Sequence, residues 1–391
     1  MSTANPPSVG PLAGLKVLEL GQLIAGPFAG KFFADFGADV IKVEPPADAK
    51  NQGGDPIRYW RKLHDGTSLW WHVQSRGKKS ITLDLRSVEG QAAAKTLALE
   101  ADVVIENFRP GTLEKWGLGY EALARDNRGL IMLRISGFGQ TGPMRDQGGF
   151  GAIAESMGGM RYVSGFPDRP PVRMNLSFGD AIASLHGVIG ILMALNHRNR
   201  TGEGQMVDVA LYEAVFNMME ATLPEYAYDG TVRERTGTSL TGIVPSNTYT
   251  SKDGVHIVIG GNGDSIFKRL AQIMGRDDWV DDPALADNAG RAARATELDQ
   301  GIGAWCAAHD ALFLLQALDA AQVPASKIFS IADIVRDPQF LARGMIESLV
   351  LEDGLKLMVP GVVPKLSRTP GRIHGRGPTL GEHNGRGFGS D

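Results

Sequence analysis

The stretch SFGDAIASLHG, residues 177–187, places a carboxylate where covalent chemistry is possible. Asp180 stands at the head of the apolar run AIASLHGVIGILMAL, which predicts a buried helix. Gly179 precedes it and small residues follow, so another molecule can approach closely. A helix start stabilises an anion by about 0.3 to 2 kcal/mol, which offsets part of the cost of burial. An ionised carboxylate in a dry pocket is suited to attack on an acyl carbon.

Asp180 also fits a purely structural role. Aspartate is a favoured N-cap, because its side chain accepts hydrogen bonds from the first free N–H groups of a helix. A cap on a solvated helix does not need the clearance that the neighbouring small residues provide. We therefore predict that Asp180 is both an N-cap and a nucleophile.

The segment GGNGDS, residues 260–265, is a second candidate. It lies between an expected strand and an expected helix, where Gly260, Gly261 and Gly263 permit positive φ angles and leave N–H groups free to face an anion. The alternative is an ordinary turn between a strand and a helix.

Four cations stand near the ends or the beginnings of expected strands, where α/β proteins bind ligands. They are Arg109 in ENFRPG and the group Arg76, Lys78 and Lys79. Singly, each fits a solvated surface charge. Together they suit a ligand that carries phosphate groups.

Other chemistries lack support. GFGQTG, residues 137–142, matches the dinucleotide fingerprint, but Pro143 and a loop follow where a helix should begin. The histidines show no metal-binding spacing, Cys306 is the single cysteine, and no G-x-S-x-G sequence is present. We expect neither a metal site nor a serine hydrolase.

Composition bears on the partners of the protein and on its cellular compartment. The chain has 391 residues and a net charge of -4, with no concentration of Lys and Arg, which argues against nucleic acid as a partner. The single thiol and the N-terminal MSTANPPSVGPLAG, which lacks a signal pattern, favour the cytoplasm. His186 and Gly187 interrupt the longest apolar run, so no membrane span is expected.

Hydrophobic periodicity predicts an α/β fold of two domains. Apolar strands alternate with amphipathic helices from residue 14 to residue 211, which indicates an open parallel sheet. A polar stretch at 225–242 reads as a linker, and a smaller α+β domain follows. The expected strands of the sheet are 16–20, 39–44, 80–85, 102–107, 130–136 and 206–211, and the long helix is 178–199.

Eight segments in combination resemble the class III coenzyme A transferases, the family of formyl-CoA transferase and carnitine-CoA transferase. They include LELGQLIAGPFAGKFFADFGADVIKVE, RGKKSITLDL, ADVVIENFRPGTLEKWGLGYE, ISGFGQTGP, FGDAIASLHGVIGILMAL, RTGEGQMVDVALYEA, PSNTYTSKDG and GGNGDSIFKRL. The resemblance implies a Rossmann-like large domain joined to a small domain, two subunits interlocked as rings, no permanently bound cofactor, and CoA thioesters as substrates. It divides the chain into a large domain (1–224), a linker (225–242), a small domain (243–320), and a return linker with the rest of the large domain (321–391).

The resemblance also implies roles for individual residues. Asp180 would form a mixed anhydride with the acyl group and then a thioester with CoA, beneath the loop of Gly260, Gly261 and Gly263. Lys78, Lys79 and Arg109, with Arg76 beside them, would line the CoA nucleotide site. The turn from Gln22 to Ala25 would direct backbone N–H groups at the acyl carbonyl.

The resemblance implies the substrate less directly than it implies the reaction. Gln22 and Ile24 depart from the formyl-CoA transferase pattern, whereas GGNGDSIFKRL and SNTY resemble members that use succinyl-CoA and other dicarboxylic acids. Arg173 or Arg161 would then bind the distal carboxylate. A racemase branch carries a His-Asp pair where this chain has Gly149 and Phe150. Exchange of an α-proton and non-catalytic binding of acyl-CoA remain the alternatives.

Overall fold

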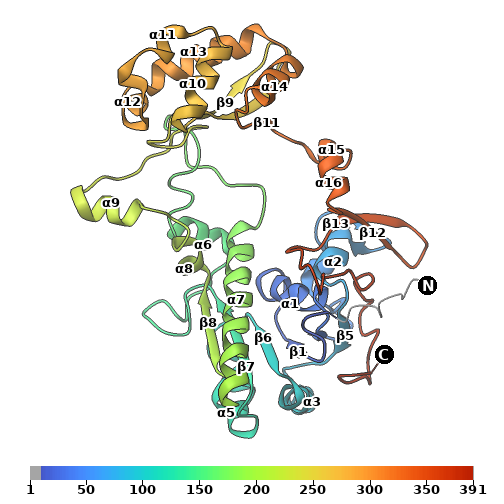
Figure 1. Ribbon diagram of the computed structural model, residues 1–391. Helices are drawn as coiled ribbons and strands as arrows, with labels where there is room; N and C mark the ends of the chain where they lie inside the picture. The colour runs from blue at the N-terminus through green and yellow to red at the C-terminus, as the bar shows by residue number, and fades with distance from the viewer. Residues whose placement is uncertain (1–9, 391) are drawn as a thin grey trace. The chain divides into compact units, whose positions relative to one another are not determined.

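The computed structural model describes residues 10–390, which form two compact units (Figure 1). The large unit holds the chain up to Met160, Met174–Glu220 and the chain from Gln339 onward. The small unit holds Arg161–Arg173 and Ala221–Pro338. The segment Arg161–Arg173 thus groups with the small unit, whereas the predicted large domain (1–224) includes it. Helix α9 occupies the beginning of the expected linker, at Thr222–Asp229.

The large unit is built on a six-stranded sheet in the order β5-β2-β1-β6-β7-β8. Every neighbouring pair is parallel, which confirms the predicted open parallel sheet. The strands are β1 (Lys16–Glu19), β2 (Asp39–Glu44), β5 (Lys79–Thr82), β6 (Val103–Glu106), β7 (Ile131–Ser136) and β8 (Met206–Ala210).

Alternating side chains on the strands send apolar groups to both faces of this sheet, as a parallel sheet requires. In β1, Val17 enters the core on one face and Leu18 enters the core on the other. One face is covered by α1 (Ala25–Asp35), α6 (Gly151–Met157), α7 (Phe178–Thr201) and α8 (Leu211–Phe216). The other is covered by α3 (Val88–Glu100), α4 (Thr112–Lys115) and α5 (Tyr120–Asp126).

Helix α7 runs along the sheet beside β7 and β8 (Figure 1). By length and composition it is the one helix among the described residues that could cross a membrane. Its buried side packs on α1 and on the sheet, with Ile182, Ala183, Ile191 and Ala194 in the core. These are the contacts of a core helix.

The small unit has a three-stranded antiparallel sheet in the order β11-β10-β9. Its core includes Phe267, which stacks on Trp279. The elements are β9 (Ser246–Thr250), β10 (His256–Gly260), β11 (Ala325–Lys327), α10 (Asp264–Ile273), α11 (Asp277–Val280), α12 (Asn288–Ala293), α13 (Ala295–Ala308) and α14 (Ala311–Ala320). Strand and helix are mixed here as the sequence predicts.

The C-terminal part returns to the large unit. After α15 (Ile331–Ile334) and α16 (Pro338–Ala342), the strands β12 (Ile346–Val350) and β13 (Lys356–Pro360) form a hairpin. The tail then docks on α2 (Leu69–Gln74) and the 3-10 helix Pro56–Tyr59, because the Pro378 carbonyl accepts hydrogen bonds from Trp71 Nε1 and Arg58 Nη1 at 2.9 and 3.1 Å.

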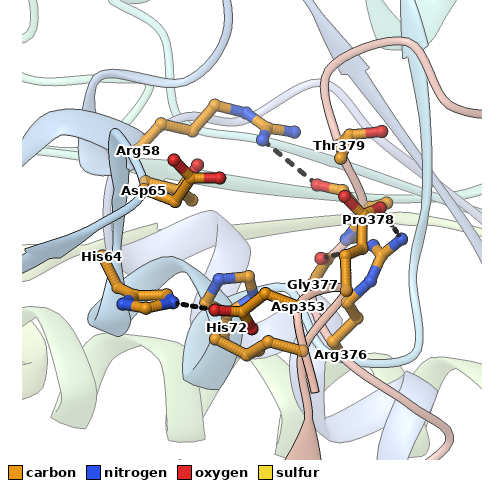
Figure 2. Close-up of a pocket in the computed structure, with 12 residues that line it drawn as sticks. Arg58, His64, Asp65, His72, Asp353, Arg376, Gly377, Pro378 and Thr379 are labelled. Carbon is orange, nitrogen blue, oxygen red and sulfur yellow. Dashed lines mark hydrogen bonds and ion pairs between the residues drawn. The ribbon is translucent and has the colours of Figure 1, made fainter. Parts of the chain in front are cut away.

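A cavity of about 200 Å³ lies where this tail meets the N-terminal part of the large unit (Figure 2). His64 Nε2 is 2.8 Å from the carboxylate of Asp353. His72 is buried, and burial, followed by the charge of Arg376, lowers the pKa of its imidazole. The charge of Arg58 acts in the same direction. Neutral His72 is therefore the form that the folded state favours.

This imidazole makes the stability of the large unit dependent on pH. Because the pKa of His72 is lowered on folding, the unfolded chain binds the proton first as the pH falls through about 6.5. The free energy of unfolding should therefore fall between pH 7.5 and pH 5.5, and His72→Gln should flatten that fall. Urea unfolding at the two pH values measures it. His383, whose pKa burial also lowers, leaves a residual slope. An unchanged slope in the variant would contradict the assignment.

Candidate active site

Asp180 is the third residue of α7, in the first helical turn, and it is partly buried. The N-cap position belongs to Ser177, whose side chain makes no capping bond. The predicted capping role of Asp180 is therefore wrong. The helix begins at Phe178, three residues before its apolar run, so Asp180 lies inside the helix and not at its cap. The carboxylate still lies at the positive end of a 24-residue helix, where an anion is stabilised.

The carboxylate lies against a second glycine that the sequence did not single out. A Cβ on Gly151, the first residue of α6, would be 2.2 Å from Asp180 Oδ2. A Cβ on Gly179 would be 2.9 Å from the Gly151 carbonyl, and the Gly179 N–H donates to Glu155 Oε1 at 3.1 Å. A side chain at Gly151 would force the Asp180 carboxylate to shift, so glycine at this position lets the carboxylate keep its place.

The turn between β1 and α1 is held by side chains from elsewhere in the large unit. Gln22 N donates to Asn107 Oδ1 at 2.8 Å, and Asn107 Nδ2 donates to the Gln22 carbonyl at 2.8 Å. Leu23 N lies 3.0 Å from both oxygens of Asp55, and Leu23 has a φ of 64°, which is uncommon for a branched side chain.

These bonds change the expected role of the turn. The N–H groups of Gln22 and Leu23 are already used within the protein. Among residues 10–390, no acceptor is recorded for the N–H of Ile24 or Ala25, and α1 has no side-chain cap at its N-terminus. Within the predicted turn from Gln22 to Ala25, the donors left for an acyl oxygen are therefore these two, at the helix start.

Ser184 connects this turn to the helix of Asp180. Its hydroxyl oxygen is 2.6 Å from the Ala25 carbonyl oxygen and 2.7 Å from the Asp180 carbonyl oxygen. These contacts hold the first turn of α7, which carries Asp180, next to Ala25, the last residue of the predicted Gln22 turn.

A buried charge cluster lies beneath the turn. Lys42 Nζ is 3.0 Å from Glu19 and 2.8 Å from Asp55, and none of the three side chains is exposed. Burial alone lowers the pKa of Lys42, but the charges of Asp55 and Glu19 outweigh it and raise that pKa above its ordinary value. Lys78 Nζ bonds the other Glu19 oxygen at 2.7 Å, and burial lowers its pKa to about 8.

The four cations predicted to bind a nucleotide do not form one cluster. Arg76 is buried in an ion pair with Asp35, and Lys78 is buried as described above. Lys79 pairs with Asp39, and both stand at the first residues of their strands. Arg109 is exposed after β6, next to Gly148. A local sequence does not distinguish a cation in a buried ion pair from a cation at the surface. All four residues were therefore predicted to be ligands of the nucleotide.

A cavity of about 250 Å³ opens at the carboxyl ends of β1, β2, β5 and β6. Its lining combines Gln22 and Arg86 with the rings of Phe108 and Trp116, which contact each other edge to face. Open α/β sheets bind ligands at this edge. The ring residues were missed because one Phe and one Trp near strand ends carry no pattern of their own.

The glycine loop belongs to the small unit. Gly260 ends β10 and Gly263 precedes α10, but none of Gly260, Gly261 and Gly263 has a positive φ, so the predicted reason for the glycines is wrong. A Cβ on Gly261 would be 2.9 Å from Leu270 Cδ2 and 3.0 Å from Pro245 Cγ. Close packing explains that glycine.

Two negative predictions can be examined in the described residues. Within residues 10–390, no cluster of three or more His, Cys, Asp or Glu side chains could hold a metal ion. GFGQTG lies in a long loop of bends and turns after β7, and the next helix, α6, begins only at Gly151. A dinucleotide fingerprint needs a helix directly after the glycines.

The sheet, the carboxylate in the first turn of α7 and the cavity define an α/β protein with a candidate ligand site at the carboxyl edge of its sheet. The family model for CoA-transferase family III matches residues 12–384, and the chain belongs to that family. It is a class III CoA-transferase.

Named relatives share nearly the whole chain. Succinyl-CoA--D-citramalate CoA-transferase of Chloroflexus aurantiacus is 50% identical over 385 residues, covering 98% of this chain and 94% of its own. Succinate--glutarate CoA-transferase of Agrobacterium fabrum is 39% identical, covering 95% and 94%. A crystal structure of a CAIB/BAIF family protein from Brucella suis has a TM-score of 0.81 at 36% identity, covering 96% and 97%.

The contact between Gly151 and Asp180 gives a testable prediction. Gly151→Ala should lower the transfer rate on the order of 100-fold, because the added methyl group displaces the carboxylate by about an ångström. Gly303→Ala is the matched control, since its Cβ would meet only Tyr249 at an ordinary 3.8 Å in a helix. Initial rates with succinyl-CoA and a dicarboxylic acid measure both. Equal activity of the two variants would show that the approach at Gly151 is unimportant.

Proposed function

We propose that this protein transfers CoA from succinyl-CoA to a dicarboxylic acid, with Asp180 as the covalent nucleophile. The observation that carries the proposal is the placement of the Asp180 carboxylate. It lies in the first turn of α7, against Gly151, and one hydroxyl group connects its helix to the start of α1. The names of these relatives, which pair succinyl-CoA with citramalate and succinate with glutarate, support the substrate class.

The chemistry follows from one carboxylate. An Asp180 oxygen attacks the thioester carbonyl of succinyl-CoA, and the C–S bond breaks. CoA departs as the thiolate, and a mixed anhydride between Asp180 and succinate remains. The thiolate then attacks the Asp180 carbonyl, which releases succinate and leaves an aspartyl-CoA thioester. The acceptor carboxylate repeats the two steps in reverse. The N–H groups of Ile24 and Ala25 would stabilise the oxyanion of each addition.

The cavity at the sheet edge is the proposed place for part of the CoA nucleotide. Phe108 and Trp116 offer aromatic surface and Arg86 offers a cation, although Arg86 already pairs with Asp84. Arg109 is a second exposed cation, after β6. Arg76, Lys78 and Lys79 remain a prediction as CoA ligands, and each would have to exchange a carboxylate partner for phosphate.

We propose, as the family resemblance implies, that the loop of Gly260, Gly261 and Gly263 covers the reacting groups and keeps water from the anhydride. Arg173 or Arg161 would bind the distal carboxylate of the dicarboxylic acid. The position of the racemase His-Asp pair is filled by Gly149 and Phe150, which supply no base, so α-proton exchange finds no support.

An interlocked homodimer is proposed from the outer side of α7. Along this side Leu185, Ile189, Leu192 and Met193 are 42%, 50%, 44% and 67% exposed. Apolar surface of this extent on a core helix indicates a partner. A second copy of the chain is the partner that the family resemblance implies.

The dimer proposal predicts the effect of charge on that surface. Ile189→Glu with Met193→Glu should convert the protein from dimer to monomer, because two carboxylates would be desolvated in the interface. Sedimentation velocity measures the mass in solution. Val88→Glu, another exposed apolar side chain, is the control and should leave the mass unchanged. A wild-type monomer would refute the proposal.

The covalent proposal predicts an adduct on Asp180. Incubation with succinyl-CoA followed by hydroxylamine or borohydride should change the mass of the peptide that carries Asp180, because both reagents attack an activated acyl group. Asp180→Ala should show no adduct and no exchange. Glu89→Ala, which removes a carboxylate from the first turn of α3, is the control and should keep both. Exchange that persists in Asp180→Ala would overturn the mechanism. Saturable CoA binding by the wild-type protein without any exchange would indicate a protein that binds acyl-CoA and does not catalyse transfer.

A further inference from the structure

Ser184 is a fully buried hydroxyl that the proposed chemistry does not use. It lies four residues after Asp180 in α7, so the two residues share one side of the helix. Its oxygen is within hydrogen-bond distance of two carbonyl oxygens, that of Ala25 at 2.6 Å and that of Asp180 at 2.7 Å. Ala25 is the first residue of α1.

A serine hydroxyl has one hydrogen, so it can donate to only one of these carbonyls at a time. Donation to the residue four positions earlier is an ordinary local bond inside a helix. Donation to Ala25 is different, because it connects two elements that are far apart in the sequence. The shared hydrogen holds the first turn of α7 against the first residue of α1.

The Ala25 end of this connection is rigid. The preceding turn is fixed at Leu23 by the carboxylate of Asp55 and at Gln22 by Asn107. Gln74 Nε2 donates to the Ile24 carbonyl at 2.9 Å, so three consecutive residues before Ala25 are anchored. Neighbouring contacts between α1 and α7 include small apolar groups such as Ala183, which set a spacing but no direction.

We infer that Ser184 is a positioning residue that fixes Asp180 relative to the free N–H groups at the start of α1. This inference rests on the proposed function, since it concerns the distance between the nucleophile and the donors for the acyl oxygen. Both groups must be in place when the carboxylate adds to the thioester. A small error in their separation slows the covalent step and leaves the binding of CoA, at the sheet edge, unchanged.

The test separates covalent chemistry from binding. Ser184→Ala should lower kcat about tenfold or more while KM for succinyl-CoA changes less than about twofold, because orientation is lost and the CoA contacts stay. In a single turnover, the adduct on Asp180 should form more slowly by the same factor. Ser184→Thr restores a hydroxyl group and should recover part of kcat.

Thr201→Ala is the matched control. Thr201 Oγ1 donates to the His197 carbonyl at 3.0 Å, the same local bond at the other end of α7. This variant should keep kcat, and thermal unfolding of all variants would show whether stability follows activity.

Wild-type kcat and adduct rate in Ser184→Ala would overturn the positioning role, as would an equal loss in Thr201→Ala. Absence of the adduct in the wild-type protein would instead overturn the proposed function.

Discussion

The site depends on a lysine whose side chain is completely buried among carboxylates. Lys42 Nζ lies between Glu19 at the end of β1 and Asp55, and it also donates to the Gly21 carbonyl at 2.8 Å. Removal of one partner from such a buried pair costs about 3 to 5 kcal/mol, because the other charge is left uncompensated. Asp55 is therefore fixed, and through it the Leu23 N–H, the turn and the start of α1 are fixed as well.

From that turn the constraints reach Asp180. Ser184 connects Ala25 to α7, and the small size of Gly151 lets the carboxylate lie against α6. The positive end of α7 keeps the carboxylate favourable as an anion. The turn after β1, which lines the cavity through Gln22 and carries the proposed oxyanion donors, thus lies at the carboxyl edge of the sheet, where an open α/β fold leaves its loops free for ligands. The buried charges supply rigidity, and the chemistry needs only one reactive group.

Much of this arrangement could be predicted from the sequence. Strand β2 has the bounds that its apolar alternation predicts, and α7 begins at Phe178, the predicted first residue of the long helix. The long-range contacts could not be predicted. Nothing local distinguishes Arg76 and Lys78, which are buried in ion pairs, from the exposed Arg109.

Two further predictions need correction. Asp180 was predicted as a cap from its residue type and its place before the apolar run, whereas Ser177 holds the N-cap position and Asp180 lies in the first turn of the helix. Gly151 was missed because its need for glycine comes from Asp180, 29 residues away in the chain.

In the proposed mechanism, Asp180 gives up and regains an oxygen atom in each turnover. An acceptor dicarboxylic acid labelled with heavy oxygen in its carboxylates would reveal this exchange. After turnover with succinyl-CoA, digestion and mass spectrometry of the peptide carrying Asp180 should show heavy oxygen in that side chain, because the acceptor oxygen stays on Asp180 when CoA takes the acyl group. Acyl-CoA product formed with no label in Asp180 would contradict the mechanism.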